Sequence, residues 1–330
     1  MDFVSTIKEK ARSDRKKLVL PEGTDPRVVK AARMLLDEQL ASNVTLLGKV
    51  ADIKKAAETE GVSLGGIDMI YPHADVGLLK FAEEYYELRK HKGITEEQAQ
   101  TDMEDPLRWG AMMVRTGLAD AIVAGAEHTT SDVLRAGLAI IGATPGLKTA
   151  SSCFVMCGLD PQFGEGGSMI FSDCAVIPDP TPEQLADIAE SSALSCREYL
   201  GAEPCVSLMS FSTKGSANHD RVSNVQKAVE ILKSRNVDFV FDGELQADAA
   251  IIPSVAEKKA PGSLVRGKAN TLVFPDLNSG NIGYKLVQRL AKAEAFGPFL
   301  QGFAKPISDL SRGASISDIV ITSAVTLSRA

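Results

Sequence analysis

The side chains with the clearest chemical potential lie near the C-terminus, in residues 305–320, KPISDLSRGASISDIV. Ser311, Arg312 and Asp318 fall within eight residues there, directly before an apolar segment that predicts a last helix. An arginine can bind a phosphate group through two parallel hydrogen bonds, and the N–H groups of a helix N-terminus favour the same charge. The residue types are therefore suited to a phosphate site at the start of that helix.

A purely structural interpretation of the same residues stays open. Ser315 is the type of residue that caps a helix N-terminus, and Asp318, three residues later, would oppose the helix dipole. Arg312 would then be a solvated surface charge. A plain cap, however, needs only one polar residue, whereas this stretch holds four serines, two aspartates and an arginine.

Short apolar runs alternate with longer segments of helical periodicity, which is typical of an α/β protein. The run DAIVAGA at 120–126 is apolar throughout, as in parallel strands that are buried on both faces. Asp25, followed by Pro26, is the expected N-cap of one helix. The predicted strands are 18–21, 43–48, 69–72, 120–126, 205–211, 237–245 and 271–276, with a hairpin formed by 150–159 and 168–177. The predicted helices include 25–40, 77–89, 129–141, 182–200 and 280–296, with extended chain from 297.

The composition limits the class of protein. The 330 residues suit two domains, and a net charge of −7 argues against a nucleic-acid surface. No apolar run reaches the roughly 18 residues that span a bilayer, and no signal peptide is recognisable, so we expect a cytoplasmic protein without membrane contact. The five cysteines and four histidines lack metal-ligand spacing, which predicts no metal site. His128 and His219 follow strands and could line a site, although a structural histidine is the commoner case.

Polar clusters follow several of the predicted strands. Ser212, Thr213 and Lys214 come after the strand 205–211. Asn278 and Ser279 come after the strand 271–276. Ligands of open α/β sheets bind beyond the C-terminal ends of strands, so these residues are candidates for substrate binding. Helix capping is the alternative explanation for each of them.

Seven motifs, in order along nearly all of the chain, resemble those of the phosphate acetyltransferases, also called phosphotransacetylases. They are VLPEGTDPRVVKAA, YYELRKHKG, ADAIVAGAEHTTSDVLR, FSTKGSA, DGELQADAA, NTLVFPDLNSGNIGYKLVQRLA and KPISDLSRGASISDIV. The resemblance implies two α/β domains of the isocitrate/isopropylmalate dehydrogenase type, with mostly parallel sheets flanked by helices and a cleft between the domains. Residues 1–145 and 297–330 would form the first domain, because the last helix folds back onto it. Residues 146–296 would form the second, with a hairpin insertion.

The same resemblance implies an enzyme that transfers an acetyl group reversibly between acetyl phosphate and coenzyme A. It would act as a homodimer and without a cofactor, since coenzyme A is a substrate. The family's catalytic serine, arginine and aspartate fall on Ser311, Arg312 and Asp318. Two family arginines that bind coenzyme A and phosphate fall on Arg89 and Arg135, which would otherwise be taken for helix-surface charges.

The implied chemistry is an attack of the coenzyme A thiolate on the carbonyl carbon of a mixed anhydride. Asp318 would accept the thiol proton, and Ser311 with backbone N–H groups would stabilise the oxyanion. Arg312, together with Arg89 or Arg135, would hold the leaving phosphate. Direct attack in a ternary complex fits better than an acyl-serine, because no histidine adjoins Ser311 in the sequence.

Three alternatives remain open at this point. One is transfer of a longer acyl group such as propionyl or butyryl, since a pocket distinguishes one methylene by only about 1–3 kcal/mol. Another is a non-catalytic regulatory module of the same fold, as in domains fused to malic enzymes. The third is an NAD(P)-dependent dehydrogenase, which shares the implied fold but needs a cluster of metal-binding aspartates. Ala314 replaces a cysteine of some members, which we expect to affect inhibition by thiol reagents and not turnover.

Overall fold

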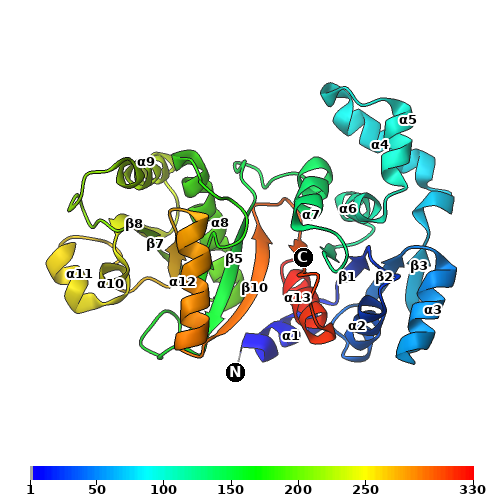
Figure 1. Ribbon diagram of the computed structural model, residues 1–330, viewed down its shortest axis with the longest axis horizontal. Helices are drawn as coiled ribbons and strands as arrows, with labels where there is room; N and C mark the ends of the chain where they lie inside the picture. The colour runs from blue at the N-terminus through cyan, green and yellow to red at the C-terminus, as the bar shows by residue number, and fades with distance from the viewer. Residues whose placement is uncertain (1–2) are drawn as a thin grey trace. The chain divides into compact units, whose positions relative to one another are not determined.

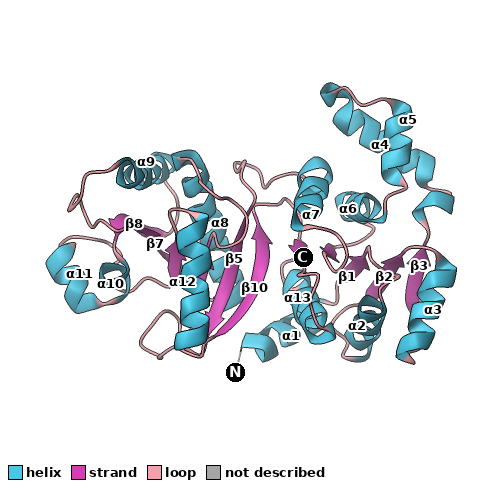
Figure 2. Ribbon diagram, viewed as in Figure 1, coloured by secondary structure: helices cyan, strands magenta, loops and turns pink. Residues whose placement is uncertain are grey.

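The computed structural model describes residues 3–330, and Figure 1 shows the order of its helices and strands. The described residues divide into two compact units. The first unit holds the described residues up to Pro145 together with Phe303–Ala330, and the second holds Gly146–Gly302. Each unit contains one sheet, mostly of parallel strands, with helices on its faces, which confirms the predicted α/β class (Figure 2).

The sheet of the first unit has five parallel strands in the order β11-β4-β1-β2-β3. In chain order they are β1 (Lys17–Leu20), β2 (Asn43–Leu47), β3 (Ile67–Ile70), β4 (Ala121–Ala124) and β11 (Ile307–Asp309). All four residues of β4 are buried, as its unbroken apolar pattern predicted. Because β11, β4 and β1 are parallel neighbours, the loops that follow them begin at the same edge of the sheet.

The helices of the first unit cover both faces of this sheet (Figure 1). Helices α2 (Pro26–Asp37), α3 (Val50–Glu60) and α13 (Ile316–Leu327) lie on one face, and α6 (Pro106–Thr116) and α7 (Thr130–Ala136) lie on the other. Asp25 caps α2 as predicted, since its side chain accepts a hydrogen bond from the Arg27 amide. The predicted helix 129–141 is α7 followed by a π-helical turn, Gly137–Ile141. The remaining helices are α1 (Phe3–Asp14), α4 (Leu78–Arg89) and α5 (Glu96–Met103), with short 3-10 turns at Pro72–Ala74 and Lys90–Lys92.

The sheet of the second unit is mixed, in the order β10-β5-β6-β9-β7-β8. Strands β5 (Ser151–Cys157) and β6 (Met169–Ser172) form the predicted antiparallel hairpin. Strands β7 (Cys205–Met209), β8 (Val240–Leu245) and β9 (Thr271–Val273) are parallel to one another and to β6. Helices α8 (Pro182–Leu200) and α9 (Asp220–Arg235) cover one face, and α10 (Ala247–Ile251), α11 (Pro253–Lys259) and α12 (Leu277–Leu290) cover the other (Figure 1).

The predicted helix 280–296 is wrong at its C-terminal end. Helix α12 ends at Leu290, and Glu294–Gln301 forms β10, which pairs antiparallel with β5. Phe299 and Leu300 of β10 are buried, and the Phe299 ring lies 5.3 Å from that of Tyr199 on α8. This packing assigns residues 297–302 to the second unit, so the boundary lies after Gly302 and not after residue 296. Strand β11, which the sequence did not indicate, follows this boundary.

Candidate active site

The Ser311–Arg312 stretch lies in the loop between β11 and α13, at the sheet edge where β1 and β4 also end. Ser311 and Arg312 are exposed, whereas Ala314 is buried beneath the loop. The Leu310 amide donates to the carbonyl of Ala124 (2.7 Å), which extends the pairing of β11 with β4 into the loop. The stretch therefore borders the turn that follows β4.

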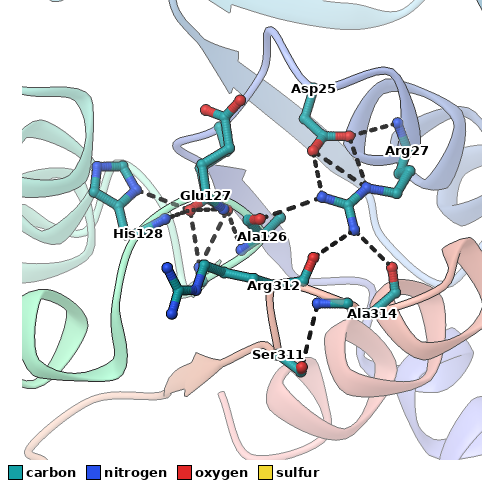
Figure 3. A network of polar contacts seen from close by, with 11 residues as sticks. Asp25, Arg27, Ala126, Glu127, His128, Ser311, Arg312 and Ala314 are labelled. Atoms are coloured by element: carbon teal, nitrogen blue, oxygen red, sulfur yellow. Dashed lines mark hydrogen bonds and ion pairs between the residues drawn. The ribbon is translucent and has the colours of Figure 1, made fainter.

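Glu22, two residues after the end of β1, organises that turn. The residue is 3% exposed, and its carboxylate accepts hydrogen bonds from the amides of Gly125, Ala126, Glu127 and His128 at 2.8–3.1 Å. The Nδ1 atom of His128 also lies 2.8 Å from Glu22 Oε1, and it must donate because a carboxylate only accepts. Figure 3 shows these contacts around Ala126, Glu127 and His128.

This network sets the charge states of Glu22 and His128. Burial opposes ionisation of Glu22, but the hydrogen bonds from His128 and the backbone amides outweigh it, so the pKa of Glu22 is lowered. The hydrogen bond to Glu22 raises the pKa of His128 against the opposing effect of burial. The turn after β4 is therefore built on a buried carboxylate that remains ionised.

Arg27, in the first turn of α2, connects the turn after β4 to the loop that holds Ser311 and Arg312. Its Nη2 donates to Asp25 Oδ2 (2.6 Å) and to the carbonyl of Ala126 (3.2 Å). Its Nη1 donates to the carbonyls of Arg312 and Ala314, each at 2.9 Å. Figure 3 shows the Arg312 carbonyl turned towards Arg27 while the Arg312 guanidinium extends away from it.

Ser311 is held as a hydrogen-bond donor. Its Oγ accepts from the amide of Gly313 at 3.2 Å, and its carbonyl accepts from the amide of Ala314 at 2.8 Å. Within residues 3–330 no acceptor takes the hydroxyl proton of Ser311, so that proton can be donated to a bound molecule. The Arg312 guanidinium likewise forms no ion pair with a carboxylate of the described chain. The loop thus presents one hydroxyl donor and one uncompensated cation.

Asp318 takes part in the helix cap that the structural interpretation predicted. Its Oδ2 accepts from the amide (2.9 Å) and the hydroxyl (2.8 Å) of Ser315, while Ser315 Oγ accepts from the Asp318 amide (3.2 Å). The other oxygen, Oδ1, accepts no hydrogen bond from the described residues, and the side chain is exposed. One oxygen therefore fixes the carboxylate and the other stays open, so the cap does not exclude a role in proton transfer.

Arg135 lies on α7, beyond the turn that Glu22 organises. Its Nη1 pairs with Asp132 Oδ1 at 3.1 Å, and its side chain is 68% exposed. Arg135 and His128 line a hollow of about 380 Å³ with residues of α5, α6 and α7. Arg108 in the same hollow pairs with Asp102, so its charge is already compensated. The complete lining is Thr101, Asp102, Asp105, Leu107, Arg108, His128, Asp132, Arg135 and Ala136.

Arg89 lies elsewhere in the first unit, at the C-terminus of α4 and not on a strand-end loop. Its side chain is partly buried, and its Nε atom has no hydrogen-bond partner within the described chain. The structure therefore leaves this guanidinium with donor capacity to spare, but brings it into no contact with Ser311 or Arg312 within residues 3–330.

The candidates of the second unit are largely engaged within it. Ser212 and Thr213 are buried. Ser212 Oγ donates to Glu244 Oε1 (3.0 Å), and Thr213 Oγ1 exchanges hydrogen bonds with Gln246 (2.9 and 3.3 Å). Burial opposes ionisation of Glu244, but hydrogen bonds from the Gly215 amide and other donors lower its pKa. These hydroxyls hold the loop after β7 in place.

Lys214 and the two residues on α12 complete the predicted set. Lys214 Nζ pairs with Asp242 and has little freedom to bind an anion without breaking that pair. Ser279 belongs to the first turn of α12, where its amide and hydroxyl bond to Asp276 at 2.8 Å. Asn278 is exposed in the same turn. Capping thus accounts for Ser279 but not for Asn278.

Glu22 and Arg27 are the site residues that sequence reasoning missed. Both lie in the motif PEGTDPR, of which only Asp25 was interpreted, as a cap. The available signal was an acidic residue two positions after a parallel strand whose last three residues are buried, a place where a charge needs several donors. Within residues 3–330 no group of three or more His, Cys, Asp or Glu side chains could hold a metal ion, and no described helix is long and apolar enough to cross a membrane.

Comparisons with known proteins agree over the whole chain. A family model described as "Phosphate acetyl/butaryl transferase" matches residues 2–327. The phosphate acetyltransferase of Treponema pallidum is 57% identical over 330 residues, covering 99% of this chain and 98% of that protein. The phosphate acetyltransferase of Thermoanaerobacterium thermosaccharolyticum is 50% identical over 326 residues, with 99% and 98% covered. The structure of a phosphotransacetylase from Streptococcus pyogenes superposes with a TM-score of 0.92 at 40% identity, covering 99% of this chain and 97% of that one.

Proposed function

The chain belongs to the phosphate acetyl/butyryl transferase family, and from that premise we propose that it is a phosphate acetyltransferase. It transfers an acetyl group reversibly between acetyl phosphate and coenzyme A. The observation that carries this proposal is the loop after β11, which holds Ser311 as a donor and Arg312 as an uncompensated cation beside a helix N-terminus. Those are the groups that an acyl phosphate needs at its carbonyl oxygen and its phosphate.

The reaction proceeds by direct attack of the coenzyme A sulfur on the acetyl carbonyl carbon. A carbon–sulfur bond forms, the carbonyl electron pair moves to oxygen, and collapse of this oxyanion breaks the bond to the phosphate oxygen. Asp318 accepts the thiol proton at Oδ1, the oxygen that the helix cap leaves open. Phosphate departs with the electron pair of the broken bond.

Ser311 and Arg312 stabilise the charge that this attack redistributes. The Ser311 hydroxyl donates to the carbonyl oxygen as it becomes an oxyanion, and Arg312 binds the phosphate oxygens. An acyl-serine intermediate is not part of the proposal, because no base of the described chain hydrogen-bonds the Ser311 hydroxyl. Both substrates must therefore be bound together.

The remaining candidate residues are proposed to bind the substrates. Arg135, which is largely exposed, and Arg89, whose Nε lacks a partner among the described residues, bind phosphate groups of coenzyme A or of acetyl phosphate. Lys214 and Asn278 are the candidates for substrate binding in the second unit, where Lys214 has to leave its ion pair with Asp242 before it can bind an anion. Ser212, Thr213 and Ser279 are already hydrogen-bonded within the second unit, and they hold the segments after β7 and β9 that carry Lys214 and Asn278.

A cytoplasmic homodimer that needs no cofactor completes the proposal. Acetyl is favoured over propionyl and butyryl because the relatives at 43–57% identity carry the name phosphate acetyltransferase. Light scattering on a size-exclusion column tests the dimer. Initial rates with acetyl, propionyl and butyryl phosphate test the acyl preference and, if all three fail, contradict the enzymatic function.

The catalytic roles are tested by thioester formation in matched variants. We expect Ser311→Ala and Asp318→Ala each to lower kcat by about 100-fold or more. Ser317→Ala removes an exposed hydroxyl from the residue next to Asp318 and should leave kcat unchanged. Ser315→Ala removes the two hydrogen bonds of the Ser315 hydroxyl but leaves the Asp318 carboxylate and its bond from the amide of residue 315. If Ser315→Ala loses as much activity as Asp318→Ala, Asp318 acts through the cap, and the role as base is refuted.

A further inference from the structure

The Arg27 side chain uses every hydrogen-bond donor of its guanidinium within the first unit. Nε donates to Asp25 at 3.1 Å, and Nη2 donates to Asp25 and to the carbonyl of Ala126. Both N–H groups of Nη1 go to the carbonyls of Arg312 and Ala314, which flank Gly313. One side chain thus joins the start of α2, the turn after β4 and the loop after β11.

The base of this connection is fixed. Asp25 is 7% exposed, and its Oδ1 also accepts from the Arg27 amide at 2.8 Å, as the N-cap of α2. The guanidinium is therefore held in one orientation by a carboxylate that is itself fixed to the helix start. The planar guanidinium has fixed donor directions, so it can hold two carbonyl groups and a carboxylate in a fixed arrangement. A lysine ammonium is a single point charge and cannot reproduce that pattern.

The far end of this connection is the segment 311–313, which is otherwise weakly held. Its three residues are exposed. The bonds from the Gly313 amide to Ser311 Oγ and from the Ala314 amide to the Ser311 carbonyl are internal to the loop. Within residues 3–330, the hydrogen bond that ties this segment to another part of the unit comes from Arg27.

We infer that Arg27 is a positioning residue that fixes the orientation of the Ser311–Arg312 loop for catalysis. It holds the carbonyls of Arg312 and Ala314 on its own side, so that the Ser311 hydroxyl and the Arg312 guanidinium face the substrate. Arg27 itself touches no substrate, because all of its donors are occupied. The inference deepens the proposed function and rests on it. A displacement of reacting groups by about 1 Å can lower a rate by about 100-fold.

The test compares Arg27→Lys and Arg27→Ala with the same changes at Arg33. Arg33 lies on the same helix, also donates to a backbone carbonyl (Gly65, 2.7 Å) and also pairs with an aspartate (Asp37, 2.8 Å), but it contacts no strand-end loop. We expect Arg27→Lys to lower kcat by about 10- to 100-fold, with KM for both substrates changing by less than about 3-fold. The Arg33 variants should keep the wild-type kcat.

Two further measurements separate positioning from a general loss of structure. Guanidinium ions at millimolar concentration should restore part of kcat to Arg27→Ala and none to Ser311→Ala. Hydrogen exchange followed by mass spectrometry should show faster exchange of the Gly313 and Ala314 amides in Arg27→Lys than in Arg33→Lys, whether or not the protein turns over. This second measurement distinguishes the inference from the proposed function, which the wild-type rate tests by itself.

Several results would overturn the inference. If Arg27→Lys raises KM while kcat stays constant, Arg27 binds substrate directly. If its activity equals that of the wild type, the loop does not need this contact. If the Arg27 and Arg33 variants lose activity in proportion to their melting temperatures and guanidinium restores nothing, the role is structural only.

Discussion

Asp309, the last residue of β11, is a buried carboxyl group with few donors. It is 5% exposed, and its Oδ2 accepts from the hydroxyl of Thr130 at 2.5 Å. Its Oδ1 has no hydrogen-bond partner within residues 3–330. This oxygen lies so close to Gly125 that a Cβ atom added to Gly125 would be 2.4 Å from it. Burial raises the pKa of Asp309 to about 6, the charge of Glu22 adds to the rise, and the bond from Thr130 opposes it.

The sign of the stability effect follows from this direction. A carboxyl group with a raised pKa binds its proton more tightly in the folded state, so the free energy of unfolding falls as the pH rises through the window from about 4 to about 6. The difference from the ordinary value of 3.8 is about 2.2 units, which corresponds to about 3 kcal/mol at pH 7. Below pH 4 this cost disappears.

Asp309→Asn removes the charge and retains an oxygen that accepts from Thr130. We expect the variant to be more stable than the wild type at pH 7.5 by about 1–3 kcal/mol. The gain is smaller than the full cost of the charge because the new amide N–H group replaces Oδ1, which has no hydrogen-bond partner among the described residues, and is itself left without an acceptor. At pH 4 this advantage should vanish. The assay is urea unfolding between pH 4 and 8, followed by fluorescence of Trp109, the single tryptophan of the chain, which is buried in the first unit.

The control is Asp68→Asn, which removes an exposed carboxylate from β3 of the same sheet. Its unfolding free energy should follow that of the wild type across the same pH range. A difference between Asp309→Asn and the wild type that stays constant from pH 4 to pH 8 would refute the reasoning, because the effect would then not come from ionisation of Asp309.

Two further predictions concern the buried glutamates. Glu22→Gln should lower the free energy of unfolding by about 3–5 kcal/mol, because an amide group replaces a buried charge that accepts several N–H bonds. In the same variant the pKa of His128 should fall towards its ordinary range, which an NMR titration of the imidazole measures, and an unchanged pKa would contradict the assigned contact. Glu244→Gln should speed hydrogen exchange in residues 212–217 of the second unit, whereas equal exchange in variant and wild type would show that Glu244 does not hold that loop.

Local signals were sufficient to predict much of the fold. Helix α8 has the predicted bounds because Thr181 caps it, Pro182 occupies its first turn and Gly201 ends it with a φ of +63°. The C-terminal end of α12 was missed because the apolar spacing of residues 280–296 also suits a helix, and the pairing of β10 with β5 overrides that preference. Strand β11 has only three residues, and its pairing with β4 defines it.

The sequence pointed to the side chains that are proposed to take part in the reaction, but not to those that hold the loops in place. Ser311, Arg312 and Asp318 lie together in the sequence, but their spacing suited a helix cap equally well, and the resemblance to the phosphate acetyltransferases singled them out. Glu22 and Arg27 act mainly on backbone groups, which every residue carries, and their side-chain partners His128 and Asp25 did not by themselves point to these contacts. The backbone partners are also distant in sequence, 103 residues for Glu22 with Gly125 and 285 residues for Arg27 with Arg312.

The order of strands in the first sheet has a consequence for synthesis of the protein. Strand β11 is translated after all of residues 146–302, yet it pairs with β4, which is made before them. Until β11 leaves the ribosome, β4 is an apolar strand with one unpaired edge, which is a template for pairing with other chains. Synthesis of the first unit therefore begins before that of the second but ends after it. A chain that stops after residue 302 should have a complete second sheet and an incomplete, aggregation-prone first sheet.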